Sequence, residues 1–217
     1  MPAALHLVRN ESLSREIPIV FFDEFDSSFN GQPFGWLKYF LAPMQDGVFY
    51  HAGQNYKMGR AVFVFAGGVN RSFEELNGRV RNPGFCEAKG PDFISRLKAH
   101  LNVQGINKPD EDADQSRYIL RRGVLLREMA RQKLQLKKGR PYQELLHRSV
   151  AEALLEINRF KHGVRSLEAI IKMCTARPGH PIGPSDLPSM DQLEMHVDAV
   201  KLLGLVDKYA KASAAVP

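Results

Sequence analysis

The sequence predicts an α/β protein in which a mostly parallel sheet with helices is followed by an all-helical segment. In the first half, short apolar runs alternate with turn residues, and stretches with helical spacing lie between them. After Asp114 the hydrophobic period changes to 3.6 residues, which is typical of helices. With 217 residues, 44 % of them hydrophobic, the chain is long enough to bury a sizeable core.

The expected strands are short and apolar. Residues 17–22 form a β-branched and aromatic run that is too short for a helix and continuous enough for a strand buried on both faces. A second buried strand is expected at 61–66, directly before Gly67-Gly68, and a third at 99–103. Strands that alternate with helices predict a parallel sheet.

The expected helices follow from apolar spacing and from glycine stops. In the first half, one helix is expected after Asn30-Gly31 with its end at Asp46-Gly47, and another around 91–97. The second half predicts three helices, of which the middle one is expected to end at His162-Gly163, and one more amphipathic helix at 193–205. The apolar positions of the three helices are Ile119, Leu120, Val124 and Leu125-Leu126, then Leu146, Val150, Leu154 and Ile157, then Leu167, Ile170, Ile171 and Cys174.

Composition predicts three segments. The polar, proline-containing stretch 107–112 is the best linker candidate, and a Pro/Gly-rich stretch follows residue 175. The expected segments are therefore 1–107, an α/β unit; 108–175, a helical unit; and 176–217, a helical extension.

The net charge of +6 is concentrated in the middle segment, where 15 Lys and Arg face 9 Asp and Glu. This excess has two interpretations, a solvated helix face or a basic surface that meets phosphate or an acidic neighbour. No apolar run approaches the ~18 residues of a membrane helix, so no membrane insertion is expected. Cys86 and Cys174 lie far apart and are expected to be free thiols in a reducing, cytoplasmic environment.

Two carboxylates mark the strongest candidate site. Asp23 and Glu24 directly follow the first apolar strand, and open α/β sheets bind their ligands at the carboxyl ends of the strands. Asp23 could hold Mg²⁺ and Glu24 could polarise an attacking water, although acids after strands also act as helix caps and turn formers. Asn70 follows the next strand, where its amide could bind a phosphate or a water, or could form a turn.

Five segments, in order along the chain, resemble the AAA+ ATPases. The Gly-Gly in the third segment and the Pro-x-Phe-Ile-x-Arg-Leu pattern in the fourth are more similar to the Clp-type branch of this family. The segments are 17–24 (IPIVFFDE) for Walker B, 34–50 for the helix and turn that follow, 61–70 (AVFVFAGGVN) for sensor 1, 89–97 (KGPDFISRL) for the arginine-finger helix, and 162–171 (HGVRSLEAII) for the sensor 2 helix.

The resemblance implies a fold, cofactors and partners. It implies a P-loop NTPase-type parallel sheet in the first segment, a helical lid in the second, ATP and Mg²⁺ as cofactors, and self-association into a ring that remodels a protein or nucleic-acid substrate. In it, Asp23 binds Mg²⁺, Glu24 activates the water, Asn70 is the sensor 1 residue, Arg96 reaches the nucleotide of a neighbouring subunit, and Arg165 is the sensor 2 arginine.

Arg96 and Arg165 can also be interpreted without the family resemblance. Arg96 lies near a helix end, where a cation interacts favourably with the helix dipole. Arg165 lies two residues after Gly163, in the first turn of the next helix, where a cation is disfavoured. That local misfit favours a phosphate-facing role for Arg165.

One required motif is missing from the sequence. The chain contains no GxxxxGK[ST] loop to hold the β and γ phosphates, and only 22 residues precede Asp23, so the nucleotide-binding part looks truncated and a gap is expected in the sheet.

The sequence therefore leaves three functions open. The chain is the C-terminal portion of an AAA+ ATPase, inactive alone; or a non-catalytic interaction protein on the same scaffold; or a basic nucleic-acid-binding module that uses 117–140.

Overall fold

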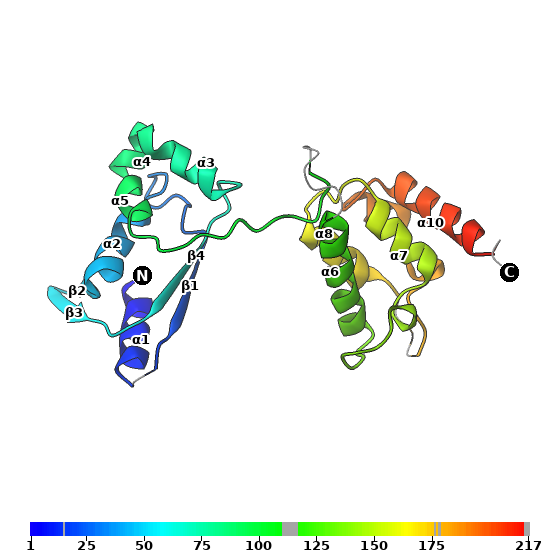
Figure 1. Cartoon of the computed structure of the whole chain (residues 1–217), viewed down its shortest axis with the longest axis horizontal. Coiled ribbons are helices and arrows are strands. Elements are labelled where there is room, and N and C mark those ends of the chain that lie inside the picture. Colours follow the sequence, from blue (N-terminus) through cyan, green and yellow to red (C-terminus); the bar gives the residue numbers. More distant parts are fainter. Residues whose placement is uncertain (15, 110–116, 176, 178, 215–217) are drawn as a thin grey trace. The chain divides into compact units, whose positions relative to one another are not determined.

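The computed structural model describes residues 1–14, 16–109, 117–175, 177 and 179–214. It divides the chain into two compact units, Met1–Val103 and Gln104–Pro217, which Figure 1 shows. The first boundary therefore lies before the expected one at 107, because Ile106 is buried in the core of the second unit. Part of the expected linker, 110–112, lies outside the described residues.

The first unit contains short helices, a parallel strand pair and a hairpin (Figure 1). Its elements are α1 Pro2–Leu13, β1 Ile19–Asp23, α2 Leu37–Asp46, β2 Val48–His51, β3 Gln54–Lys57, β4 Val62–Ala66, α3 Phe73–Gly78, η1 Arg79–Arg81, α4 Pro83–Glu87 and α5 Gly90–Ile94. Two of the three predicted strands of the first half are present, as β1 and β4. α2 ends at Gly47 in the left-handed conformation (φ 61°), which confirms the predicted stop. The hairpin β2–β3 was not predicted from the sequence.

The parallel sheet has only two strands in the described part of the chain. β1 pairs with β4 in the register Ile19↔Val62 to Asp23↔Ala66. The predicted third strand at 99–103 is wrong. There Asn102 Oδ1 accepts a hydrogen bond from Phe73 N at 2.8 Å, and the His100 ring stacks on Phe73, so this segment is attached to the start of α3.

The prediction that β1 is buried on both faces is also wrong. Its side chains alternate, and Ile19 is 74 % exposed and Phe21 63 % exposed, on the same face as Val62 and Val64 of β4. On the opposite face, aromatic side chains of both strands contact the helices, because the core of this unit lies between the sheet and α2 and α5. These contacts join Phe22 and Phe65 to Phe40, and Phe65 to Phe93.

The second unit is helical, as predicted. Its elements are α6 Arg117–Lys133, η3 Tyr142–Glu144, α7 Arg148–Glu156, α8 Val164–Met173, η4 Pro184–Asp186, α9 Met190–Glu194 and α10 Ala199–Ala214. The region after 175 is not a separate extension, because Val197, Leu202 and Val206 belong to the same core cluster as the residues of α7 and α8. Where one helix was predicted at 193–205, the chain forms α9 and α10.

Two further helix predictions need correction. α7 ends at Glu156, and Gly163 (φ 56°) is instead the N-cap of α8, so the glycine begins a helix rather than ending one. In α6 the buried positions are Tyr118, Arg122, Leu126 and Ala130, whereas Leu120 and Val124 are exposed. The buried stripe was missed because one of its members is an arginine. Of the helices in the described ranges, none is long and apolar enough to cross a membrane.

Candidate functional site

The register of the sheet brings three of the sequence-predicted residues of the first unit, Asp23, Glu24 and Asn70, to the turns at one edge. β1 and β4 run parallel, and their last paired residues are Asp23 and Ala66, so the turns that follow the two strands begin at the same end of the sheet. Asp23 and Glu24 are exposed, and neither has an ion-pair partner among the residues that the structure describes. Asp23 Oδ1 accepts a hydrogen bond from Glu24 N at 3.0 Å, and Glu24 adopts a positive φ of 51°. Both carboxylates are therefore accessible to a ligand.

The metal capacity of this edge is small. Within the described ranges, no group of three or more His, Cys, Asp or Glu side chains is arranged to hold a metal ion. Mg²⁺ is bound in proteins through one or two carboxylates plus waters and substrate phosphates. The exposed carboxylate of Asp23 fits that mode, and the phosphate oxygens would have to complete the coordination.

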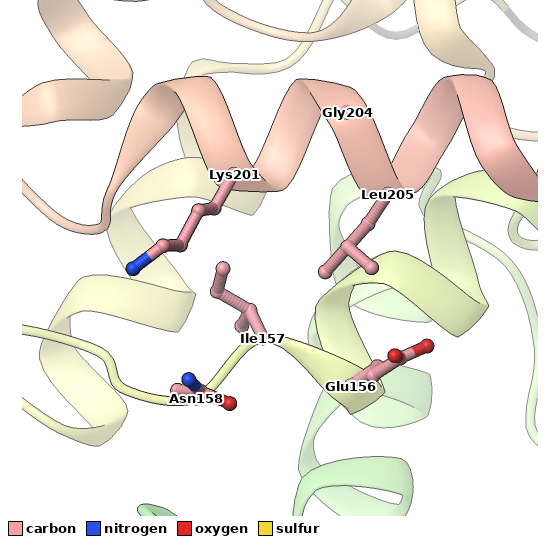
Figure 2. A pocket seen from close by; sticks show the side chains of 6 residues that line it. All are labelled: Glu156, Ile157, Asn158, Lys201, Gly204 and Leu205. Carbon is pink, nitrogen blue, oxygen red and sulfur yellow. The ribbon is translucent and has the colours of Figure 1, made fainter.

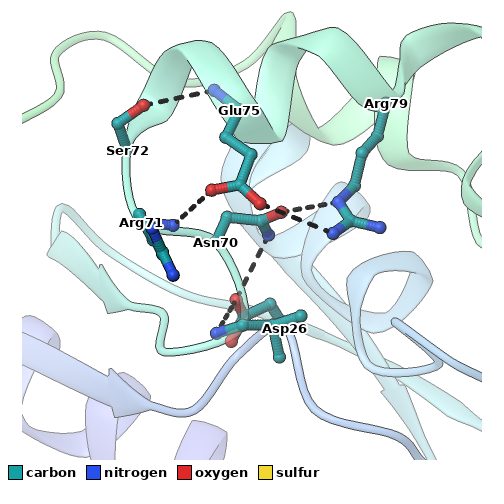
Figure 3. Close-up of polar contacts among 7 residues, drawn as sticks. Asp26, Asn70, Arg71, Ser72, Glu75 and Arg79 are labelled. Atoms are coloured by element: carbon teal, nitrogen blue, oxygen red, sulfur yellow. Dashed lines mark hydrogen bonds and ion pairs between the residues drawn. The ribbon is translucent and has the colours of Figure 1, made fainter.

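Asn70 lies in the turn after β4 and is half buried. Its side-chain amide has a partner at each end: Nδ2 lies 3.5 Å from Asp26 Oδ2, and Oδ1 accepts a hydrogen bond from Arg79 Nε at 2.5 Å (Figure 3). The structure thus connects Asn70 to the turn after β1, as the sequence-based site requires, but through Asp26 rather than through Asp23 or Glu24.

Asp26 is the residue of this edge that sequence reasoning missed. Its side chain is only 4 % exposed, and its carboxylate accepts hydrogen bonds from Gly68 N at 3.2 Å and Val69 N at 3.0 Å. A Cβ on Gly67 would lie 2.8 Å from Asp26 Oδ2, so this close approach requires glycine at 67. The third acid of the run Asp-Glu-Phe-Asp, together with the Gly-Gly after the next strand, was the signal that could have revealed it.

The polar contacts continue beyond Asn70 into α3. Arg79 forms an ion pair with Glu75 at 3.8 Å, and its guanidinium lies over the Phe34 ring at 5.6 Å. Glu75 Oε2 in turn accepts a hydrogen bond from Arg71 N at 2.8 Å, and Ser72 caps the helix by accepting from Glu75 N (Figure 3). The network therefore joins the ends of both strands to the first turn of α3.

Arg96 is held at a different place in the first unit. Its Nη1 donates to Asp92 O and its Nη2 to Gln45 Oε1, both at 2.5 Å, and an ion pair with Asp92 spans 3.9 Å. These contacts lie at the ends of α5 and α2, where a shallow hollow is lined by Met44, Gln45, Asp92, Ser95, Arg96 and Lys98. The carbonyl contact agrees with the helix-end interpretation of Arg96, and no hydrogen bond or ion pair within the described residues joins Arg96 to Asp23, Glu24 or Asn70.

Arg165 belongs to the second unit. It is the second residue of α8 and is exposed, which confirms its predicted place in the first turn of a helix. In the described part of the chain, no hydrogen bond or ion pair holds its guanidinium. The cation is therefore accessible at a helix end that favours anions.

Most of the basic run around α6 is engaged by backbone carbonyls. Arg122 is fully buried, stacks between the rings of Tyr118 and Phe160 at 4.9 Å from each centroid, and donates to four carbonyl oxygens. Burial lowers the pKa of Arg122 to about 10. The other contacts are Arg121 to Gly105 O, Arg127 to Arg140 O, Arg131 to Leu136 O and Glu128, and Lys133 to Lys172 O.

A second hollow lies in the helical unit between the end of α7 and α10. It is lined by Glu156, Ile157, Asn158, Lys201, Gly204 and Leu205 (Figure 2). Its charged groups are already paired: Glu156 accepts hydrogen bonds from Tyr209 and Lys208, which lower its pKa, and Lys201 pairs with Asp198 at 3.2 Å. The contacts of Glu156 join the end of α7 to α10, whereas the Lys201–Asp198 pair is local to the start of α10. The lining of this hollow presents no unpaired acid or base for chemistry.

The features of this chain that point to a function are the sequence motifs and the geometry of the sheet edge. Comparison of the chain with protein-family models, with curated proteins and with solved structures finds no match.

Proposed function

We propose that this chain supplies the Walker B, sensor 1, arginine-finger and sensor 2 elements of an AAA+-type ATPase. In this proposal the ATP site is completed by a P-loop on another stretch of polypeptide, and ATP hydrolysis drives the remodelling of a macromolecular substrate. Asp23 holds Mg²⁺, Glu24 polarises the attacking water, and Asn70 senses the terminal phosphate. Arg96 acts on a neighbouring subunit in a ring, and Arg165 meets the nucleotide from the helical unit.

The observation that carries the proposal is the parallel pairing of β1 with β4. It places two accessible carboxylates and a turn containing Asn70 at the same carboxyl edge. Phosphoryl transfer needs a metal, a held water and charge stabilisation rather than covalent chemistry, so an acid pair and a polar amide on the turns after two paired strands suit it. The same edge is where open α/β sheets bind ligands.

The state of the sheet supports the need for a further polypeptide. Parallel sheets are normally covered on both faces, yet Ile19, Phe21 and Val62 leave one face apolar and exposed. The segment 99–103 does not close onto β4, and its Leu101 and Val103 are more than 80 % exposed. An added strand and helix would cover this surface.

The exposed apolar face of the sheet also fits a second candidate function, that of a non-catalytic interaction protein. A non-catalytic interaction protein would use the same apolar face to bind its partner, and an in-frame GxxxxGK[ST] in the coding sequence upstream of Met1 would exclude it in favour of the ATPase. The nucleic-acid reading has less support, because five of the basic side chains between 117 and 140 donate to backbone carbonyls.

The 217-residue chain alone is expected neither to bind nor to hydrolyse ATP measurably. Asp23 and Glu24 lack the backbone amides and the lysine that would hold the phosphates. Isothermal titration calorimetry with ATP and Mg²⁺ measures this directly. A dissociation constant in the low micromolar range, with one site per chain, would show that the P-loop is not needed and would overturn the proposal as stated.

In a polypeptide that joins a P-loop module to this chain, Glu24→Gln is expected to bind ATP normally and to hydrolyse it about 10²-fold or more slowly, because an amide does not accept the proton of the attacking water. Asp23→Asn is expected to weaken Mg²⁺-dependent turnover. Phosphate release and ATP binding are measured side by side for each variant. Glu87→Gln, at another exposed glutamate, is the matched control, and equal turnover of Glu24→Gln and Glu87→Gln would remove Glu24 from the mechanism.

A further inference from the structure

The buried carboxylate of Asp26 has no direct place in the chemistry proposed above. At 4 % exposure, its charge is largely removed from water, which is unfavourable unless hydrogen bonds replace the lost hydration. Three N–H donors supply that replacement, and all three belong to one short turn: Gly68 N, Val69 N and Asn70 Nδ2. Both oxygens are occupied, so this acid is engaged by the protein and unlike Asp23 is not accessible to a metal.

The turn after β4 specifically suits a carboxylate at position 26. Successive N–H groups at 68 and 69 point to separate oxygens of the same carboxylate, so both need acceptors. An asparagine would place its own NH₂ group against one of these donors, and an alanine would leave both without a partner. The absent Cβ at Gly67 allows the carboxylate to come this close.

The same contacts orient the side-chain amide of Asn70. The guanidinium of Arg79 can only donate, so the amide oxygen must face it, at 2.5 Å. The NH₂ group is then directed to the carboxylate of Asp26, at 3.5 Å, as Figure 3 shows. The longer of the two bonds is the one to Asp26, and it is the contact that an incoming acceptor such as a phosphate oxygen would compete for.

We propose that Asp26 is a positioning residue that holds the Gly67–Asn70 turn, and with it the amide of Asn70, against the end of β1. It acts through the turn and touches neither nucleotide nor metal. The contribution of Asp26 to ATP hydrolysis rests on the proposed function, whereas its positioning of the turn is a property of this chain alone. Asp26 thus links the acid pair after one strand to the amide after the next.

Amide exchange and side-chain amide resonances, followed by NMR on the labelled 217-residue chain, test this role. Asp26→Asn is expected to accelerate exchange at Gly68 or Val69 about tenfold or more and to shift the NH₂ signals of Asn70. Signals of the aromatic core around Phe40 and Phe93 are expected to stay in place. Asp23→Asn is the matched control, because within the described residues its carboxylate accepts a hydrogen bond from Glu24 N alone, and it should leave Gly68, Val69 and Asn70 unchanged.

Two outcomes would overturn the role of Asp26. One is exchange at Gly68 and Val69 that is the same in Asp26→Asn, Asp23→Asn and the unsubstituted chain. The other, which does not depend on a variant that folds, is the absence of protection at these two amides in the unsubstituted chain. Neither measurement involves nucleotide, so a P-loop-bearing polypeptide that fails to hydrolyse ATP would refute the proposed function and leave this test unaffected.

Discussion

Replacing Arg122 by methionine is expected to destabilise the helical unit by about 4 kcal/mol or more, the largest stability effect of any substitution considered for this chain. The guanidinium donates from Nε to Ile106 O at 2.6 Å, from Nη1 to Leu155 O at 2.8 Å and Ile157 O at 2.5 Å, and from Nη2 to Asn158 O at 3.2 Å. Three of these carbonyls lie at the end of α7, where the last carbonyls of a helix have no partner within the helix. Methionine would fill much of the volume and leave all four acceptors without this donor, two of them buried and two partly buried.

The charge itself works against stability, so the loss must come from the hydrogen bonds and the stacking. Burial lowers the pKa of Arg122 to about 10, which means that the folded unit holds this proton less tightly than the unfolded chain does. That unfavourable contribution is complete well below pH 10 and decreases as the pH rises beyond about 10. At neutral pH the helical unit therefore carries the full desolvation cost, and the four carbonyl contacts offset it.

Urea unfolding, monitored by resolved NMR signals of the helical unit, measures the effect. Arg121→Met is the matched control, because Arg121 is the neighbouring arginine and its guanidinium has one hydrogen bond to the described part of the chain, to Gly105 O at 2.9 Å. The loss is expected to stay below about 1 kcal/mol. Arg122→Lys keeps a cation with fewer donors and is expected to lie between the two. Unfolding midpoints that are equal for Arg122→Met and Arg121→Met would contradict this account.

The second large effect is on catalysis. In a polypeptide that carries the P-loop, Arg96→Ala is expected to abolish most ATP turnover while ATP binding by the same subunit stays nearly intact. An arginine that reaches a nucleotide from a neighbouring subunit is worth ~10³ to 10⁵ in rate, whereas the loss of a charge at a helix end costs at most about 1 kcal/mol of stability. The alternative interpretation is that Arg96 only stabilises the end of its helix, and its contact with Asp92 O agrees with this. Under that interpretation the Arg96→Ala protein would have nearly normal turnover.

Two controls separate these readings of Arg96. Gln45→Ala removes a partner of Arg96 in this structure but keeps the guanidinium, and Lys98→Ala removes a neighbouring cation that lines the same hollow. Both are expected to retain most of the turnover. Mixing Arg96→Ala subunits with Glu24→Gln subunits should recover activity, because some interfaces then combine an intact Glu24 with an intact Arg96. A fully active Arg96→Ala protein would exclude the assignment.

Burial of the strands could not be predicted from their composition alone. Residues 17–22 are apolar throughout, and such a run predicts a strand covered on both faces. Among the residues that the structure describes, β1 pairs with β4 alone and has helices on one face, so Ile19 and Phe21 remain exposed. The segment 99–103 has strand-like residues as well, but Asn102 found hydrogen-bond partners at the start of α3 instead of a neighbouring strand.

The candidate site was predicted in part. Asp23, Glu24 and Asn70 were identified because an acid pair and an amide follow consecutive apolar strands, and the register brings their turns to one edge. Asp26 was missed because its partners, the amides of Gly68 and Val69, are more than 40 residues away in the sequence. The place of Arg165 was predicted correctly, since Gly163 and the apolar spacing that follows mark the start of α8 locally.

The sequence by itself determined the local elements: two apolar strands, the stop of α2 at Gly47, and the apolar positions of α7 and α8. These depend on residue spacing and backbone conformation within a few residues. Only the tertiary structure decided that Arg122 lies in the core, that Asp26 holds the turn after β4, and that one face of the sheet stays apolar and exposed. A buried polar side chain is stable only where distant backbone groups satisfy it, and the course of the chain brings those groups together.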